Sequence, residues 1–134
     1  MKIDIATGAI TFPQGAISRS TDKAHFLESS IGRAARESLT NANWSHFEID
    51  PEESWAGTVI FDGDAVDRIF LSMKLDSENP ESWTVEREKA RQAIHDKWLQ
   101  GELGPPPYSY SWGRVVSDFD PKGLASEIII VYDR

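Results

Sequence analysis

Alternating hydrophobic and polar residues predict β-strands at both ends of the chain. Residues 2–13 alternate on either side of a Thr7-Gly8 pair, which predicts a β-hairpin. Tyrosine and tryptophan alternate with serine over 108–112, which predicts a strand with one aromatic face. Residues 127–132 carry hydrophobic side chains on both faces, which is typical of a central strand covered by helix on one side.

The middle of the chain predicts three more strands, at 44–50, 55–61 and 69–75. Asp62-Gly63 is a favoured pair for a tight turn between two antiparallel strands. Because the connections are short, we expect these three strands to form an antiparallel meander.

A helical period appears in two other segments. The first, 20–39, begins with oxygen-bearing side chains that suit an N-cap, and Gly32 in its middle allows two shorter helices. The second runs from about 81 to 100, with a predicted buried stripe of Ala90, Ile94 and Trp98.

The end points of this second helix are also predicted. Pro80 suits its first turn, and Gly101 and Gly104 precede a run of three prolines that forbids its continuation.

These elements give the order ββ-α-βββ-α-ββ and an α+β fold. We expect one antiparallel sheet with two helices packed on one face. The sequence shows no internal repeat, linker or low-complexity segment, so residues 1–134 are expected to form a single domain.

Composition narrows the class of protein without naming a reaction. The chain has 134 residues, of which 40% are hydrophobic and 27% charged, values typical of globular domains. It has no cysteine, which excludes disulfides, thiolate metal sites and a cysteine nucleophile. No signal peptide or membrane-spanning run is evident, so we expect a cytoplasmic protein.

Charge points toward a class of partner. The chain carries 14 basic and 22 acidic side chains, a net charge of −8. Such a surface repels phosphate backbones and anionic lipids. We therefore expect no nucleic-acid or membrane binding, and a basic protein as the better electrostatic match.

One segment concentrates this negative charge. Between Glu48 and Asp67 the chain has seven acids and no lysine or arginine. Together with Trp55 as an aromatic anchor, they form the predicted partner-binding site; an ordinary solvated edge is the alternative. The predicted site residues are Glu48, Asp50, Glu52, Glu53, Trp55, Asp62, Asp64 and Asp67.

Catalytic and metal chemistry find little support in the residue pattern. The acids after Asp62 lack the remaining ligands of a calcium loop. The three histidines lack the spacing that places two imidazoles on one helical face, and no GxSxG elbow or P-loop is present. We therefore expect no metal, no cofactor and no enzymatic activity.

The C-terminal half carries a recurring set of features: Trp98-Leu99 at a helix end, the loop 104–106, Trp112-Gly113 in a Tyr/Trp strand, and a 120–123 turn. In these features it is similar to small bacterial proteins of unknown function. This resemblance implies a shared fold and attaches no catalytic residue. In size and acidity the chain also resembles immunity proteins of bacterial polymorphic toxin systems.

Three hypotheses follow for the function. The first is a non-enzymatic binding protein, most concretely an immunity protein that covers basic residues of a cognate toxin. The second is a small enzyme or ligand-binding domain with a pocket near His95, Asp96, Tyr110 and Trp112. The third is a subunit that self-associates through an exposed strand edge, and the sequence leaves the oligomeric state open.

Overall fold

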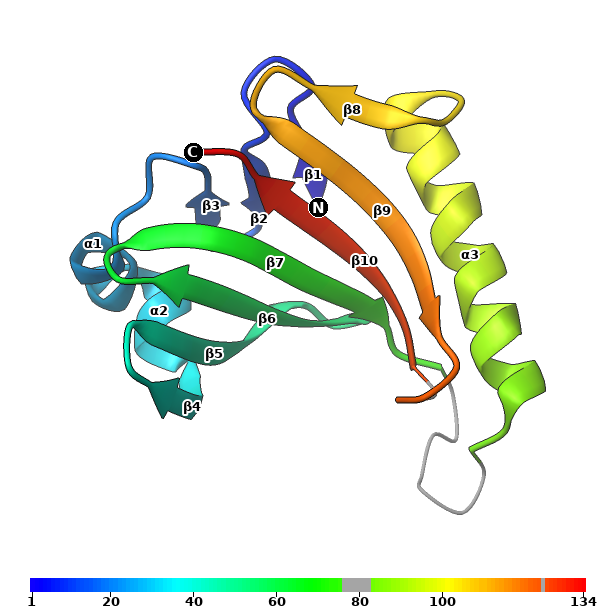
Figure 1. Cartoon of the computed structure of the whole chain (residues 1–134), viewed down its shortest axis with the longest axis horizontal. Helices are drawn as coiled ribbons and strands as arrows, with labels where there is room; N and C mark the ends of the chain where they lie inside the picture. The colour runs from blue at the N-terminus through cyan, green and yellow to red at the C-terminus, as the bar shows by residue number, and fades with distance from the viewer. Residues whose placement is uncertain (76–82, 124) are drawn as a thin grey trace.

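The computed structural model describes residues 1–75, 83–123 and 125–134. Within these ranges it contains ten strands in two antiparallel sheets, together with three α-helices (Figure 1). The α+β class and the antiparallel pairing are confirmed. The predicted order and the single sheet are wrong in detail, because the structure has three strands that the hydrophobic pattern did not predict: 15–17, 36–41 and 113–120. In the last of these, the strand predicted from 108 onward turns after Tyr110, and the turn predicted at 118 is still strand.

The first of these segments adds a strand to the N-terminal hairpin. The small sheet has the order β1-β2-β3. Phe12 pairs with Gly15 across a two-residue turn, so the chain reverses at Pro13-Gln14 where the hairpin was expected to end. The strands are β1 (Lys2–Ile3), β2 (Ile10–Phe12) and β3 (Gly15–Ile17).

The large sheet has seven strands in the order β4-β5-β6-β7-β10-β9-β8. The expected meander is confirmed as β5-β6-β7, and Gly63 (φ 60°) takes the left-handed conformation at its second turn. The C-terminal strand is central, as expected, because β10 pairs with both β7 and β9. The strands are β4 (Arg36–Asn41), β5 (Trp44–Glu52), β6 (Trp55–Asp62), β7 (Ala65–Met73), β8 (Tyr108–Tyr110), β9 (Gly113–Asp120) and β10 (Ala125–Tyr132).

The first predicted helix is two short helices, α1 (Lys23–Glu28) and α2 (Ser30–Ala34). Asp22 caps α1 by accepting the His25 N–H, as the sequence predicted. The break falls at Ser29 instead of Gly32, because Ser29 ends one helix and caps the next. The expected continuation to residue 39 is strand β4, whose residues are all exposed.

The second helix is α3 (Val85–Leu103), capped by Thr84 and ended by Gly104 (φ 82°). Pro80 and residues 81–82 lie outside the described residues. The predicted stripe is wrong by one position along the chain. Ala90 and Ile94 are exposed and Trp98 is partly buried, whereas the buried positions are Glu88, Arg91, His95 and Leu99.

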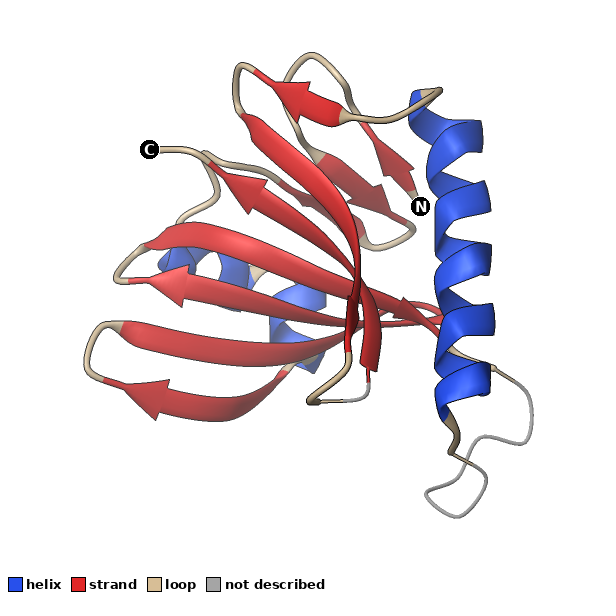
Figure 2. Ribbon diagram, turned by 45° about the vertical axis from the view of Figure 1, so that its right-hand side comes forward, coloured by secondary structure: helices blue, strands red, loops and turns tan. Residues whose placement is uncertain are grey.

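The helices and the small sheet pack on one face of the large sheet, here called the inner face (Figure 2). Phe47 of β5 contacts Phe26 of α1, Trp55 of β6 contacts His95 of α3, and the Tyr132 hydroxyl of β10 donates to the Gly8 carbonyl. The buried hydrophobic residues of these layers form one core cluster.

No described element covers the opposite face, here called the outer face (Figure 2). Across the middle of this face runs a row of five residues, each paired with the next one on the neighbouring strand. Phe70 and Ile129 in this row are only partly buried, and Val116 is 37% exposed. The row consists of Glu48, Thr58, Phe70, Ile129 and Val116.

Candidate partner-binding site

The seven acids of 48–67 do not form one surface. Glu48 and Asp50 lie on β5, and Glu52 and Glu53 lie at the β5–β6 turn. The other three lie around the β6–β7 turn, at the opposite end of the strands. The eight residues of β6 separate the two ends by roughly 20 Å, so the acidic segment is divided into two groups.

Several of these carboxylates already have a partner. Glu48 accepts from Arg36 at 2.9 Å, Asp67 accepts from Arg68 at 2.6 Å, and Glu52 binds the N-terminal ammonium. The remaining four form no ion pair with any residue of the described ranges and are exposed. They are Asp50, Glu53, Asp62 and Asp64.

Trp55 does not belong to either group. It is 4% exposed and its side chain points into the core. Its ring stacks on His95 with centroids 5.7 Å apart and packs against Trp98 at 5.0 Å. The predicted role of Trp55 as a surface anchor therefore does not fit the structure.

The structure brings Glu127, which is distant in sequence, to the groove that Glu48 and Asp50 line, and it places two more acids beside Glu127. Glu127 of β10 lies opposite Asp118 of β9, and Asp120 follows two positions along the same face. A groove of about 240 Å³ joins Glu127 to Glu48 and Asp50 across the outer face. We call this feature the acidic groove. Phe70, Ala56 and Thr58 also line it, and Arg36 lies beside Glu48.

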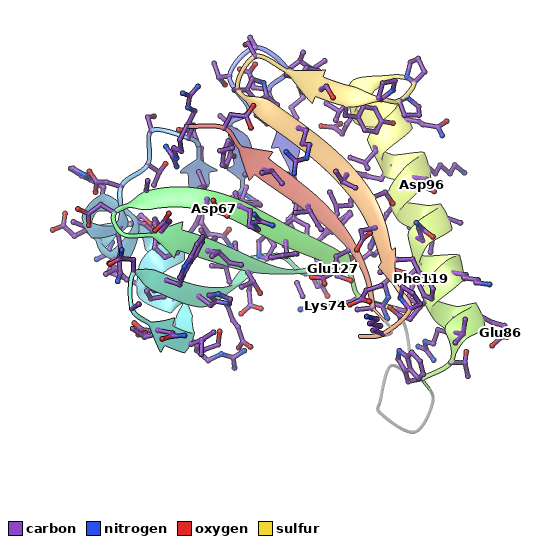
Figure 3. The ribbon with its side chains drawn as sticks, viewed as in Figure 1. Asp67, Lys74, Glu86, Asp96, Phe119 and Glu127 are labelled. Carbon is purple, nitrogen blue, oxygen red and sulfur yellow. The ribbon has the colours of Figure 1, made fainter. Side chains whose placement is uncertain are left out.

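In the acidic groove, Arg36 pairs with Glu48, whereas Asp50 and Glu127 have no ion pair with a described residue. Burial raises the pKa of Glu127, and the nearby carboxylates of Asp118, Asp120 and Glu88 raise it further. Lys74 lies at the same end of the sheet (Figure 3), and it forms no ion pair with Glu127. A cation from outside would therefore relieve a repulsion that exists in the free protein.

Figure 3 shows that Asp67 of the β6–β7 group lies apart from Glu127 of the acidic groove. Asp67 lies by the β6–β7 turn, and Glu127 lies toward the other end of the same sheet.

The sequence offered one signal for the acids that the predicted site did not include. Asp118 and Asp120 share one face of a strand, but the sequence pattern predicted a turn there. Their position beside Glu127 depends on the β9–β10 register.

Beside the acidic groove, β7 and β10 separate. Their last pair is Leu71 with Ile128, and the same register would continue with Ser72 opposite Glu127 and Met73 opposite Ser126. Instead the Ser126 N–H donates to Glu88 Oε1 at 2.9 Å, and the Met73 carbonyl accepts from Arg91 Nη1 at 2.6 Å. We call this separation the strand fork.

The side chains that fill the strand fork are themselves buried and paired. Glu88 and Arg91 are 4% and 6% exposed, and Arg91 Nη2 lies 3.1 Å from Glu88 Oε2. His95, which is fully buried, accepts the Met73 N–H through Nε2 at 3.0 Å. Helix α3 thus satisfies backbone groups that strand pairing leaves open.

The same contacts define the state of His95. Because Nε2 accepts a hydrogen bond, the proton of the neutral ring lies on Nδ1. Burial lowers the pKa of His95 to about 4, and the charge of Arg91 acts in the same direction. His95 is therefore neutral at physiological pH and enclosed by protein.

The predicted pocket near His95 and Trp112 does not form. His95 packs on Trp55, whereas Trp112 packs on Tyr110 and Tyr132 and donates its indole N–H to the Ile5 carbonyl. Of the proposed set, Asp96 lines a groove between the described residues of α3 and β9.

Within the described ranges, no three metal-binding side chains converge, and no helix is long and apolar enough to cross a membrane. No family model, curated protein or solved structure matches the chain.

Proposed function

We propose that this protein is a non-enzymatic binding domain, and that a basic protein partner docks on its outer face over the acidic groove. The observation that carries the proposal is the uncovered sheet face, where Phe70 and neighbouring small side chains lie between Glu48, Asp50 and Glu127. A partner's lysine or arginine would place its apolar stem on Phe70 and its charge among the carboxylates.

The raised pKa of Glu127 supports this choice of partner. Carboxylates crowded on one face repel one another, and a bound cation converts the repulsion into attraction. The partly buried Phe70 and Ile129 supply apolar area that such contact would remove from water. The acids at the β6–β7 turn also have an apolar neighbour, because Trp44 is 40% exposed and pairs with Asp62, so the experiment below includes a variant at that end of the sheet.

The most specific form of this proposal is an immunity protein. Enzymes that act on anionic substrates such as nucleic acids present basic residues in their clefts. An acidic, partly apolar face could cover those residues and block the cleft. The partner would then be toxic when expressed alone, and co-expression of the present chain would restore growth.

A pull-down with two charge-matched variants tests the proposal. The groove variant carries Asp118→Lys and Glu127→Lys, and the turn variant carries Asp62→Lys and Asp64→Lys. Both replace two acids with two lysines, so they alter net charge equally. Each tagged protein is incubated with lysate of the producing cell at low and high salt, and retained proteins are identified by mass spectrometry.

We expect a basic protein that wild type and the turn variant retain at low salt, and that high salt releases. The groove variant should fail to retain it. Loss from the turn variant instead would move the site to the other end of the sheet. Equal retention by all three proteins at both salt concentrations, or no retained partner, would contradict docking through the acids.

A further inference from the structure

Strand β9 has a partner along its whole length on one side only. On that side, β10 pairs with every residue from Gly113 to Asp120. On the other side, β8 pairs only as far as Val115, opposite Tyr108. Within the described part of the chain, no strand lies against the remaining edge of β9.

The direction of the backbone groups along this edge follows from the ladder. The Asp133 N–H donates to the Trp112 carbonyl at 2.9 Å, so residues 112, 114, 116 and 118 direct their backbone groups toward β10. The alternate residues direct theirs the other way. Beyond Val115, the N–H and C=O groups of Ser117 and Phe119 therefore line the free edge.

The chain's own sequence explains why β8 stops there. Continuing the pairing of Tyr108 with Val115 would place Pro107 opposite Val116 and Pro106 opposite Ser117. A proline has no N–H to donate to the Ser117 carbonyl. The proline run therefore ends the strand and leaves this edge open.

The edge borders a groove of about 430 Å³. Asp96 and Gln100 of α3 form one wall, and Val116 and Ser117 of β9 form the other, with Pro106 at one end. In Figure 3, Asp96 lies on α3 beside this groove, and Phe119 lies on β9 beyond the residues that line it. We call it the edge groove.

We propose that the edge groove binds an extended peptide segment of a partner, which adds to the large sheet antiparallel to β9 and carries a lysine or arginine facing Asp96. Main-chain hydrogen bonds to Ser117 and Phe119 would supply the pairing. Asp96 is half-buried and has no ion pair with a described residue, so a cationic side chain at this position complements the wall.

This site is separate from the acidic groove and does not rest on the proposed function. The edge groove uses backbone groups of β9 and the helix wall, whereas the acidic groove uses side chains on the outer face. Loss of either binding activity can therefore be measured without the other.

The test uses the peptide acetyl-Thr-Val-Thr-Lys-Thr-amide with the ¹⁵N-labelled full-length protein. In the antiparallel register, its lysine lies opposite Ser117 and its valine lies opposite Phe119. We expect titration to shift the backbone amide signals of Ser117 and Phe119 the most. A peptide with glutamate in place of lysine should bind at least about fivefold more weakly, because Asp96 repels it.

N-methylated peptides separate strand pairing from simple charge attraction. Methylation of the lysine amide removes the donor to the Ser117 carbonyl, and we expect binding at least about tenfold weaker. Methylation of the central threonine amide, which points away from β9, should leave affinity unchanged. In the protein, Asp96→Asn should weaken binding, and the matched change Asp62→Asn at the far end of the sheet should not.

Two outcomes would overturn the proposal. The first is equal binding by both N-methylated peptides, or no shift at Ser117 and Phe119 with the parent peptide. The second needs no peptide: in the free protein, the Ser117 and Phe119 amides should exchange with solvent much faster than those of Val116 and Asp118, which bond β10. Equal protection would mean that the edge is already occupied.

Discussion

The inner face of the large sheet is covered in two different ways. Beneath α1, Phe26 packs against Phe47 and Phe61 with ring centroids 5.5 and 5.2 Å apart. Beneath α3, the buried side chains next to the sheet include Glu88, Arg91 and His95. Helix α1 thus covers its strands with apolar side chains, whereas α3 also buries charged and polar side chains against its strands.

The state of the strands beneath each helix explains the difference. Strands β5, β6 and β7 are paired along the region that α1 and α2 cover, so their backbone groups need nothing from a helix. At the strand fork, β7 and β10 separate, and the groups of Met73 and Ser126 need partners. Polar residues are buried where the backbone ladder is open.

The largest expected effect comes from substituting a buried polar residue of α3 at the strand fork. Arg91→Met removes the cation beside Glu88 and the donor to the Met73 carbonyl. Because this leaves a buried carboxylate without its partner, we expect a loss of about 3–5 kcal/mol in the free energy of unfolding. Urea denaturation measures it. The apolar counterpart Phe61→Leu should cost only about 1–2 kcal/mol, since it leaves no polar group unpaired.

A second substitution identifies the cause of that loss. Glu88→Gln combined with Arg91→Met leaves no buried charge, and the amide oxygen introduced at position 88 can still accept the Ser126 N–H. We expect the double variant to be more stable than Arg91→Met alone, with a coupling energy of at least about 1 kcal/mol in a double-mutant cycle. Additive losses would show that Glu88 and Arg91 act independently.

The strand fork also marks a part of the fold that the sequence pattern could not predict. The strands between 44 and 75 were predictable because their inward residues alternate. The orientation of α3 was not, because Ala90, Ile94 and Trp98 form the most hydrophobic stripe available, whereas the buried stripe lies one residue later. One residue turns a helix by about 100°. Only the position of the strand fork shows why Arg91 and His95 face inward.

The next largest effect is a pH dependence of the free energy of unfolding, and it comes from the polar residues beneath α3. His95 has its pKa lowered to about 4 in the folded protein, against about 6.5 when unfolded. Between these values the unfolded chain binds the extra proton, so stability rises with pH by up to about 1.4 kcal/mol per unit. His95→Gln can still accept the Met73 N–H but does not titrate, and should remove this slope.

The measurement is the difference between the two unfolding free energies at several pH values from about 4 to 7. His25 titrates in the opposite sense, because Asp22 raises its pKa, but it is present in both proteins and cancels. The slope of wild type minus His95→Gln isolates the buried ring. A constant difference across this range would mean that the pKa of His95 is the same in the folded and the unfolded chain.

The candidate site was only partly predictable from sequence. Glu48 and Asp50 were in the predicted set, but Glu127, which lines the same groove, is more than seventy residues away along the chain. Cross-strand register places them together, and no local pattern encodes that register. Conversely, Trp55 and Asp62 are close to Glu48 in sequence but lie in the core and at the far end of the sheet.

The smallest expected effect concerns Glu127, where stability and binding should respond in opposite directions. Its pKa is raised above the ordinary value of 4.5, so the stabilisation by its protonated form is present at low pH and lost as pH rises through the folded pKa. At neutral pH, Glu127→Gln should therefore raise the free energy of unfolding, by less than about 1 kcal/mol, and the gain should shrink toward pH 4. The same change should weaken retention of a basic partner at low salt. A variant that loses stability at neutral pH, or that retains the partner unchanged, would show that the charge of Glu127 serves the fold and not the docking surface.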